Sequence, residues 1–197
     1  MTSFLGCLFF ILGGGSLRIE TPRLIIRNFC LNDLDRFDKM KSNPKLAYMA
    51  GIKPHNSKKV SQMRLENILY YDDYFAIVKD DILIGDLNFY KDPVRVASDA
   101  FQLGFMLDEE FHHKGYMKEA LTYFIPYIFK KHQIDILTCV TIINNYAAQK
   151  TIEALGFKYD GIIRHYKRLY NDDMVDCKIY TMTKDEYERN DKIWHMN

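Results

Sequence analysis

The stretch from residue 100 to residue 128 constrains the fold most, because a strand pattern and a helix pattern meet there at one glycine. Residues 100–107 read AFQLGFML, and their apolar side chains alternate as on one face of a strand. Behind Gly115, apolar residues recur at the spacing of one helix face: Met117, Ala120, Leu121, Phe124, Ile125 and Ile128. The sequence therefore predicts a strand that passes through a short loop into a long helix.

The composition fits one globular domain that binds a small or local ligand. The chain has 197 residues, of which 48% are hydrophobic, which is enough for a core of its own. Lys+Arg 27 against Asp+Glu 26 leaves a net charge of +1, so we expect no nucleic acid and no membrane as partners. The cysteines include no CxxC pair, which predicts reduced thiols in a cytoplasmic protein and no metal site.

Strand and helix patterns alternate from residue 17 onward without a repeat or a low-complexity linker. Strands are expected at 23–28, 74–79, 82–90, 100–107, 135–143, 157–168 and 174–182. Helices are expected at 31–41, 57–71, after Gly115 with a kink at Pro126, and at 146–155. These elements predict one α+β domain over residues 17–187, followed by a tail at 188–197. Its sheet should be mixed and mostly antiparallel, with about six or seven strands and about four flanking helices.

The first residues, MTSFLGCLFFILGGGS, differ from the rest of the chain. Their apolar run is too short to span a bilayer and follows no basic residue, which argues against a signal peptide. One interpretation is a wrongly assigned start, because glycine codons in series resemble a ribosome-binding sequence and Leu17 follows them. The alternative is a genuine apolar arm over residues 1–16. In both cases we expect the domain itself to begin at Leu17.

The glycine at the strand-to-helix junction has two interpretations. It can serve packing alone, or it can let a phosphate group approach the N-terminus of the helix. At that terminus consecutive backbone N–H groups lack partners and the helix dipole is positive, which favours an anion. In the segment HHKGYM and just behind it, Lys114 and Lys118 add positive charge beside Gly115. We therefore expect a pyrophosphate to bind here.

A second, shorter helix is indicated by residues 144–161, NNYAAQKTIEALGFKYDG. Asn144 or Asn145 is the expected N-cap, and Gly156 is expected to end the helix in a left-handed conformation. Together with the first segment, at this spacing and in this order, the pattern resembles the GNAT superfamily of acetyl-coenzyme A-dependent N-acetyltransferases. The TPRLIIRNF opening and the IRHYKRLYNDDMVDCKIYTM segment resemble the branch of ribosomal-protein N-terminal (alanine or serine) acetyltransferases.

The resemblance covers residues 17–187 and implies where acetyl-coenzyme A binds. In this family two parallel strands in the middle of the sheet splay apart, and the pantetheine arm of coenzyme A bonds to the free edge of the first. That strand is residues 101–107 here, and Gly104 within it is either a point of close approach or a bulge. The implied cofactor-binding residues are Phe105, Met106, Leu107, His112, His113, Lys114, Gly115, Tyr116, Met117, Lys118 and Asn145.

The catalytic groups are less evident than the cofactor site. Where relatives carry a serine or tyrosine that donates a proton to the thiolate, this chain has Ala148 and Ile152. We therefore expect direct attack of a primary amine on the thioester, with a backbone N–H polarising the carbonyl. The candidate catalytic residues are Asn145, Tyr166 and Glu109, and the other groups that could move protons are Asp108, Glu110, His112, His113, His165 and Asp176.

The resemblance implies an acyltransferase that moves an acetyl group from acetyl-coenzyme A to a primary amine. The expected acceptor is the α-amine of a protein or peptide, and a small-molecule amine is the alternative. Another alternative is a GNAT-like module that binds coenzyme A without catalysis. A nucleotide-binding domain of Rossmann type is disfavoured, because no G-x-G-x-x-G follows the first strand. We expect a monomer or a homodimer.

Overall fold

The computed structural model describes residues 17–95 and 99–194, so the arm predicted at 1–16 lies outside the described residues. The described residues form one eight-stranded sheet: β1 (Arg18–Glu20), β2 (Ile25–Asn28), β3 (Tyr74–Lys79), β4 (Ile82–Lys91), β5 (Ala100–Leu107), β6 (Ile136–Ile142), β7 (Lys158–Arg168) and β8 (Met174–Thr183). The α-helices are α1 (Leu34–Ser42), α2 (Pro44–Met49), α3 (Lys58–Ile68), α4 (Tyr116–His132), α5 (Tyr146–Glu153), α6 (Lys184–Arg189) and α7 (Asp191–Trp194), and the 3-10 helices are η1 (Leu31–Asp33) and η2 (Glu109–Phe111). None of these helices has the length and apolar character needed to cross a membrane.

The strands follow the order β1-β2-β3-β4-β5-β6-β8-β7. Every neighbouring pair is antiparallel except β5 and β6, which are parallel and pair only between residues 100–102 and residues 136–138. Beyond these residues β5 continues beside β4, and β6 continues beside β8. The α+β class and the mostly antiparallel sheet are thereby confirmed. The described residues contain eight strands and seven α-helices, more than the numbers expected.

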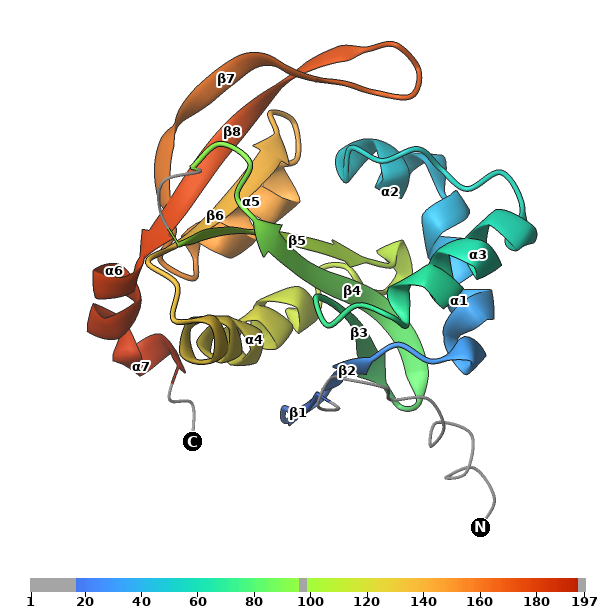
Figure 1. The fold of residues 1–197 in the computed structure, drawn as a ribbon, viewed down its shortest axis with the longest axis horizontal. Helices are drawn as coiled ribbons and strands as arrows, with labels where there is room; N and C mark the ends of the chain where they lie inside the picture. Colours follow the sequence, from blue (N-terminus) through green and yellow to red (C-terminus); the bar gives the residue numbers. More distant parts are fainter. Residues whose placement is uncertain (1–16, 96–98, 195–197) are drawn as a thin grey trace.

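Helices cover both faces of the sheet (Figure 1). On one face lies α4, where Phe124 packs edge-on against Phe75 with ring centroids 5.2 Å apart. On the other face, α1 and α3 bury Phe37 and Leu65 against β3 and β4. The long β7–β8 hairpin arches over α2 (Figure 1), and Tyr48 of α2 packs against a cluster that includes Leu169 and Val175 of the hairpin.

Local sequence explains most of the element boundaries. Asp80 and Asp81 have φ of 48° and 61°, so they form a left-handed turn between β3 and β4 without the usual glycine. Asn145 is the N-cap of α5, and Gly156 has a φ of 92° just after that helix, as predicted. α4 continues through Pro126 as one helix, because its apolar face is buried on both sides of the proline.

The sequence patterns did not predict β1, α2, α6 and α7. α2 is short and begins at Pro44, with Asn43 accepting hydrogen bonds from the first N–H groups of the helix. Residues 188–194, which were assigned to a tail, lie mostly in α6 and α7. Trp194 is only 9% exposed, and its indole N–H donates a hydrogen bond to the carbonyl of Tyr187. The packed domain therefore extends at least to Trp194.

One buried carboxylate fixes the end of the sheet where β5 and β6 still pair. Asp92, just after β4, is 4% exposed and accepts a hydrogen bond of 2.8 Å from the Thr138 hydroxyl on β6. Arg95 binds this carboxylate and also pairs with Asp160 on β7. Burial alone would raise the pKa of Asp92, but the hydrogen bonds to the carboxylate outweigh it and lower that pKa. β4, β6 and β7 are therefore tied together at this end.

Replacing Thr138 with valine keeps the shape of the side chain and removes the hydroxyl that Asp92 binds. A hydrogen bond to a charged group contributes about 1.5–3 kcal/mol, so we expect the free energy of unfolding in urea at pH 7 to fall by about 2 kcal/mol. The folded-state pKa of Asp92 is lowered, so this contribution is present above the ordinary pKa of about 3.9 and is lost as the pH falls. Thr151→Val removes an exposed hydroxyl from α5 and is the control, with an expected change below about 0.5 kcal/mol. Equal losses in the two variants would contradict the anchoring role of Asp92.

Candidate active site

β5 presents a free backbone edge to the gap between β5 and β6. The N–H of Asp92 donates to the carbonyl of Ala100, so the even-numbered residues of β5 face β4. Backbone groups of alternate residues face the same edge of a strand, so those of the odd-numbered residues face β6. Beyond residue 102, β6 no longer pairs with β5. Of the predicted cofactor residues, Phe105 and Leu107 therefore turn backbone groups toward the gap, whereas the backbone of Met106 faces β4. The His112 side chain already hydrogen-bonds the Leu107 carbonyl at 2.9 Å.

The loop between β5 and α4 forms a cradle of backbone N–H groups. His113 and Gly115 adopt left-handed conformations with φ of 59° and 77°. In the part of the chain that the structure describes, the N–H groups of residues 113–118 donate no hydrogen bond, and Glu119 is the first residue of the helix that does. Unpaired N–H groups at a helix N-terminus suit phosphate oxygens. The structure thus brings together the predicted residues of this loop: His112, His113, Lys114, Gly115, Tyr116, Met117 and Lys118.

Arg23, just before β2, supports this loop and was not predicted. Its Nε pairs with the Glu119 carboxylate at 2.5 Å, and its Nη1 donates to the Lys114 carbonyl at 3.0 Å. Its guanidinium lies 4.6 Å from the centre of the Tyr116 ring. Because these partners lie more than ninety residues from Arg23, no local pattern in the sequence could have linked them. The contacts engage a carbonyl of the loop and a carboxylate of α4, and they leave the N–H groups of the loop free.

Beyond the paired residues, the gap between β5 and β6 opens into a pocket of about 250 Å³, which we call the central pocket. β4, β5 and β6 line it, together with residues 49–52 after α2 and residues 166 and 167 of β7. Four of the predicted site residues line it: Phe105, Met106, Asn145 and Tyr166. The pocket therefore joins the free edge of β5 to the space between α2 and the β7–β8 hairpin.

Two of the predicted catalytic residues are engaged by other parts of the chain. Glu109 lies in η2 and does not line the central pocket. The Lys45 ammonium lies 2.8 Å from the Glu109 carboxylate and lowers its pKa, which disfavours Glu109 as a base near neutral pH. Asn145 accepts a hydrogen bond from the N–H of Ala148 and donates one to the carbonyl of Met49. Its amide thus joins α5 to α2, and a contact with coenzyme A stays a prediction.

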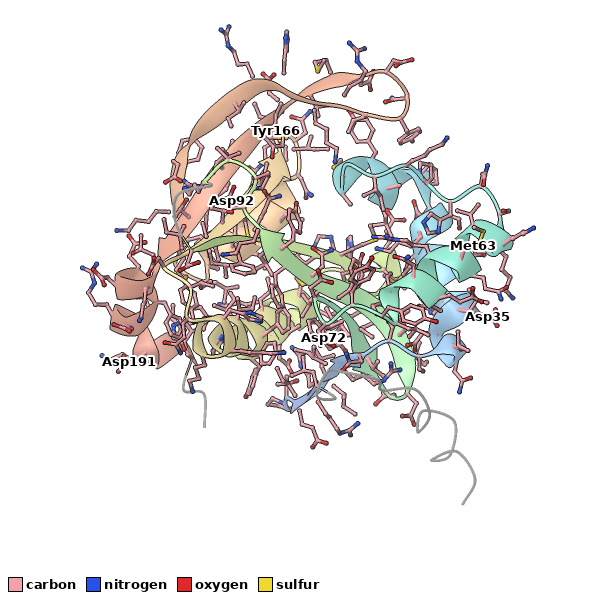
Figure 2. All side chains as sticks on the ribbon, viewed as in Figure 1. Asp35, Met63, Asp72, Asp92, Tyr166 and Asp191 are labelled. Atoms are coloured by element: carbon pink, nitrogen blue, oxygen red, sulfur yellow. The ribbon has the colours of Figure 1, made fainter. Side chains whose placement is uncertain are left out.

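Tyr166 lines the central pocket beside an irregularity in β7. The register between β7 and β8 shifts there, and His165 has a left-handed φ of 53°. Asp176 on β8 accepts a hydrogen bond of 2.8 Å from the His165 N–H, so its carboxylate stabilises the irregular strand, which re-aims the next side chain. Tyr166 lies on the β7–β8 hairpin (Figure 2). Its hydroxyl forms no hydrogen bond within residues 17–95 and 99–194, and burial raises its pKa.

A buried ion pair forms the inner wall of the central pocket. Lys41 on α1 and Asp86 on β4 are 3% and 1% exposed, and their charged atoms lie 2.7 Å apart. The Tyr74 hydroxyl donates to Asp86 and accepts from Lys41, each at 3.0 Å. Burial alone would lower the pKa of Lys41, but Asp86 and Tyr74 raise it above its ordinary value. Lys41 therefore stays charged, and both carboxylate oxygens of Asp86 stay occupied.

Gly104 makes room for a neighbouring side chain. The register between β4 and β5 is unbroken and places Asn88 opposite Gly104, so the alternative of a bulge is excluded. A Cβ at Gly104 would overlap the side-chain oxygen of Asn88. Any larger residue at this position would therefore displace Asn88 from the wall of the central pocket.

Most of the chain matches a known protein family. Residues 23–158, more than half of the chain, match the family described as "Acetyltransferase (GNAT) domain". The chain belongs to the GNAT family. It is 22% identical over 173 residues to the uncharacterized N-acetyltransferase YoaA of Bacillus subtilis, which spans 84% of this chain and 96% of that protein. YnaD of the same organism, also an uncharacterized N-acetyltransferase, is 23% identical over 153 residues, spanning 75% of this chain and 86% of that protein.

Solved GNAT structures share the fold. A GNAT acetyltransferase from Bacillus anthracis has a TM-score of 0.76 and 18% identity, covering 86% of this chain and 99% of that chain. A ribosomal-protein alanine acetyltransferase from Vibrio fischeri has a TM-score of 0.74 and 21% identity, covering 87% and 98%. RimL, a ribosomal-protein α-N-acetyltransferase in complex with coenzyme A, has a TM-score of 0.74 and 19% identity, covering 86% and 99%. The protein is an acetyl-coenzyme A-dependent N-acetyltransferase of the GNAT family.

Gly115→Asp tests whether the loop before α4 holds the pyrophosphate of this GNAT cofactor. The new carboxylate would stand beside the unpaired N–H groups and repel a diphosphate, so we expect the Kd for acetyl-coenzyme A in calorimetry to rise by at least about tenfold. Gly115→Asn is the matched control, because it has the same shape without the charge and also tolerates a left-handed backbone. Equal affinities in the two variants, with similar melting temperatures, would show that the pyrophosphate lies elsewhere.

Proposed function

We propose that this GNAT enzyme acetylates the α-amine at the N-terminus of a peptide or protein. The observation that carries the proposal is the lining of the central pocket. Of the described residues that line it, Asp86 is the only carboxylate and none is a histidine. Asp86 is engaged by Lys41 and Tyr74, so the pocket offers no free strong base. Such a site suits an amine that is already partly neutral at physiological pH.

The ordinary pKa values of amines favour the α-amine. With a pKa of about 7.8, roughly a quarter of an α-amine is neutral at pH 7.4. A lysine side chain, with a pKa of about 10.4, is neutral only about once in a thousand molecules at that pH. The fold shared with ribosomal-protein N-terminal acetyltransferases supports the same choice.

The chain's own groups have separate tasks in this proposal. The N–H groups of residues 113–118 bind the pyrophosphate, and the free edge of β5 bonds the amide groups of the pantetheine arm. The acceptor nitrogen forms a bond to the thioester carbonyl carbon, and the carbon–sulfur bond breaks. The amine releases one proton to water, and Tyr166 regains from water the proton that it gives to the thiolate. Tyr166 donates a proton to the departing thiolate, because its hydroxyl is unengaged by the described residues and lines the pocket. A thiol with a pKa of about 8.5 needs only modest help to leave.

The choice between α-amines and lysine amines is tested with two matched peptides. One has a free N-terminal alanine and no lysine, and the other has an acetylated N-terminus and one internal lysine. We expect kcat/KM at pH 7.4 to be higher for the first peptide by about 100-fold, which follows mainly from the neutral fractions of the two amines. Comparable values would reveal a strong base in the site and would contradict the proposal.

Tyr166→Phe tests the proton donor. Because burial raises the pKa of Tyr166 above its ordinary value of about 10, the hydroxyl stays protonated, and kcat/KM of the parent should rise through one apparent pKa and stay flat to about pH 10. We expect the variant to lose about 100-fold in kcat, since general acid catalysis contributes about that factor or more. Its Kd for acetyl-coenzyme A should remain that of the parent. An unchanged kcat would mean that the thiolate leaves without an acid.

A further inference from the structure

A second pocket of about 300 Å³ lies beside the central pocket. We call it the α3 pocket, because Arg64 and Asn67 of α3 line one side of it. Tyr74, Asn88 and Tyr90 line both the α3 pocket and the central pocket. The two pockets are therefore neighbours, and these three side chains lie between them.

The residues around the two pockets carry hydrogen-bonding groups that the protein does not use. Asn88 and Tyr90 on β4 lie opposite Gly104 and Gln102 on β5, so their side chains share one face of the sheet. In the described residues four buried side-chain polar atoms lack a partner, and three of them, on Asn88, Gln102 and Thr141, belong to residues that line the central pocket. An unpaired buried polar group costs about 1–3 kcal/mol, so a ligand that pairs with these atoms gains affinity.

The charges and the amide side chains favour a peptide as this ligand. In the central pocket Asp86 balances Lys41, and Lys167 adds a positive charge. In the α3 pocket Arg64 and Asp73 have opposite charges. The pockets therefore have no excess of negative charge that would attract a polyamine. The unpaired atoms of Asn88 and Gln102 are amide oxygens, which accept hydrogen bonds, and the N–H groups of a peptide can donate to them.

We infer that the acceptor is a peptide that lies extended across β4, with its α-amine in the central pocket and a later side chain in the α3 pocket. Asn88 and Gln102 hydrogen-bond the peptide between the two pockets. The inference rests on the proposed function, because it requires the central pocket to receive an α-amine. Neighbouring strands are about 4.8 Å apart, so the path from β5 to β3 is about 10 Å, or about three extended residues. The enzyme therefore recognises about three residues of its acceptor.

Acceptors of one and three residues test this inference in the full-length enzyme. The measurement is the ratio of kcat/KM for alanyl-alanyl-leucine amide to kcat/KM for alanine amide, at saturating acetyl-coenzyme A. We expect a ratio of at least about ten in the parent, since one hydrogen bond and one buried side chain together exceed the 1.4 kcal/mol that corresponds to tenfold.

Two variants and a control locate the effect. Asn67→Trp fills the α3 pocket and should bring the ratio close to one. Asn88→Leu removes a hydrogen-bonding group between the pockets and should lower the ratio by about tenfold. Gln62→Trp places the same bulk elsewhere on α3, where it lines neither pocket, and should keep the parent's ratio.

The outcomes separate this inference from the proposed function. Equal kcat/KM values for the two acceptors in the parent, or an unchanged ratio in Asn67→Trp, would overturn the inference and leave the proposed function standing. Acetylation of neither α-amine, with acetyl-coenzyme A still bound in calorimetry, would overturn the proposed function and the inference with it. A linear polyamine that is preferred to the tripeptide and equally sensitive to Asn67→Trp would overturn the assignment of a peptide.

Discussion

The early end of the pairing between β5 and β6 is the constraint on which the rest of the structure depends. The two strands pair only between residues 100–102 and 136–138, while β4 and β8 hold them on their outer sides. Closing the gap would break one of these outer ladders, so the gap persists. It leaves the odd-numbered residues of β5 beyond residue 102 without a strand partner and opens the central pocket of about 250 Å³. At the far end of β5, the chain passes directly into the loop whose N–H groups precede α4.

Three polar side chains are buried beside this opening. Because they bind one another, they are not available to transfer protons to or from a substrate. A buried charge is stable only when its partner and its remaining hydrogen bonds are in place. Lys41, Asp86 and Tyr74 meet this condition among themselves. These contacts stabilise the wall of the pocket. They also occupy Asp86, the only carboxylate among the described residues that line the pocket, so Asp86 is not available as a base. The α-amine that we propose as acceptor needs no base from the pocket, so the proposal links a feature of core stability to the choice of substrate.

The elements with strong periodicity could be predicted from the sequence, and the polar or short ones could not. β5 and α4 carry regular apolar patterns, so their type and order were evident, whereas α2 is short and α6 has six residues of which Tyr187 alone packs on the core. The eight-stranded sheet includes β1, whose three residues are too few for a period of two. Arg23 and Glu119 form an ion pair across 96 residues, which only the folded chain brings together. The N-cap bond from the Ala148 N–H to Asn145 was predicted from the local sequence, whereas the bond from the Asn145 amide to the Met49 carbonyl depends on where α2 lies. A contact of Asn145 with the cofactor stays a prediction.

The proposed cofactor site and the proposed acceptor site differ in how much of each can be predicted from sequence, because they are built from different chemical groups. The proposed cofactor site consists of backbone N–H and C=O groups. A glycine, a helix start and a strand edge position these groups, and each of the three leaves a local pattern in the sequence. The acceptor site that we propose consists of side chains from α1, α3, β4, β5, β6 and β7. Each of them looks like an ordinary polar position in its own segment. Backbone recognition suits a cofactor that is common to the whole family. Side-chain recognition can change with a single substitution, so the residues of the acceptor site are where members of one fold can diverge in substrate.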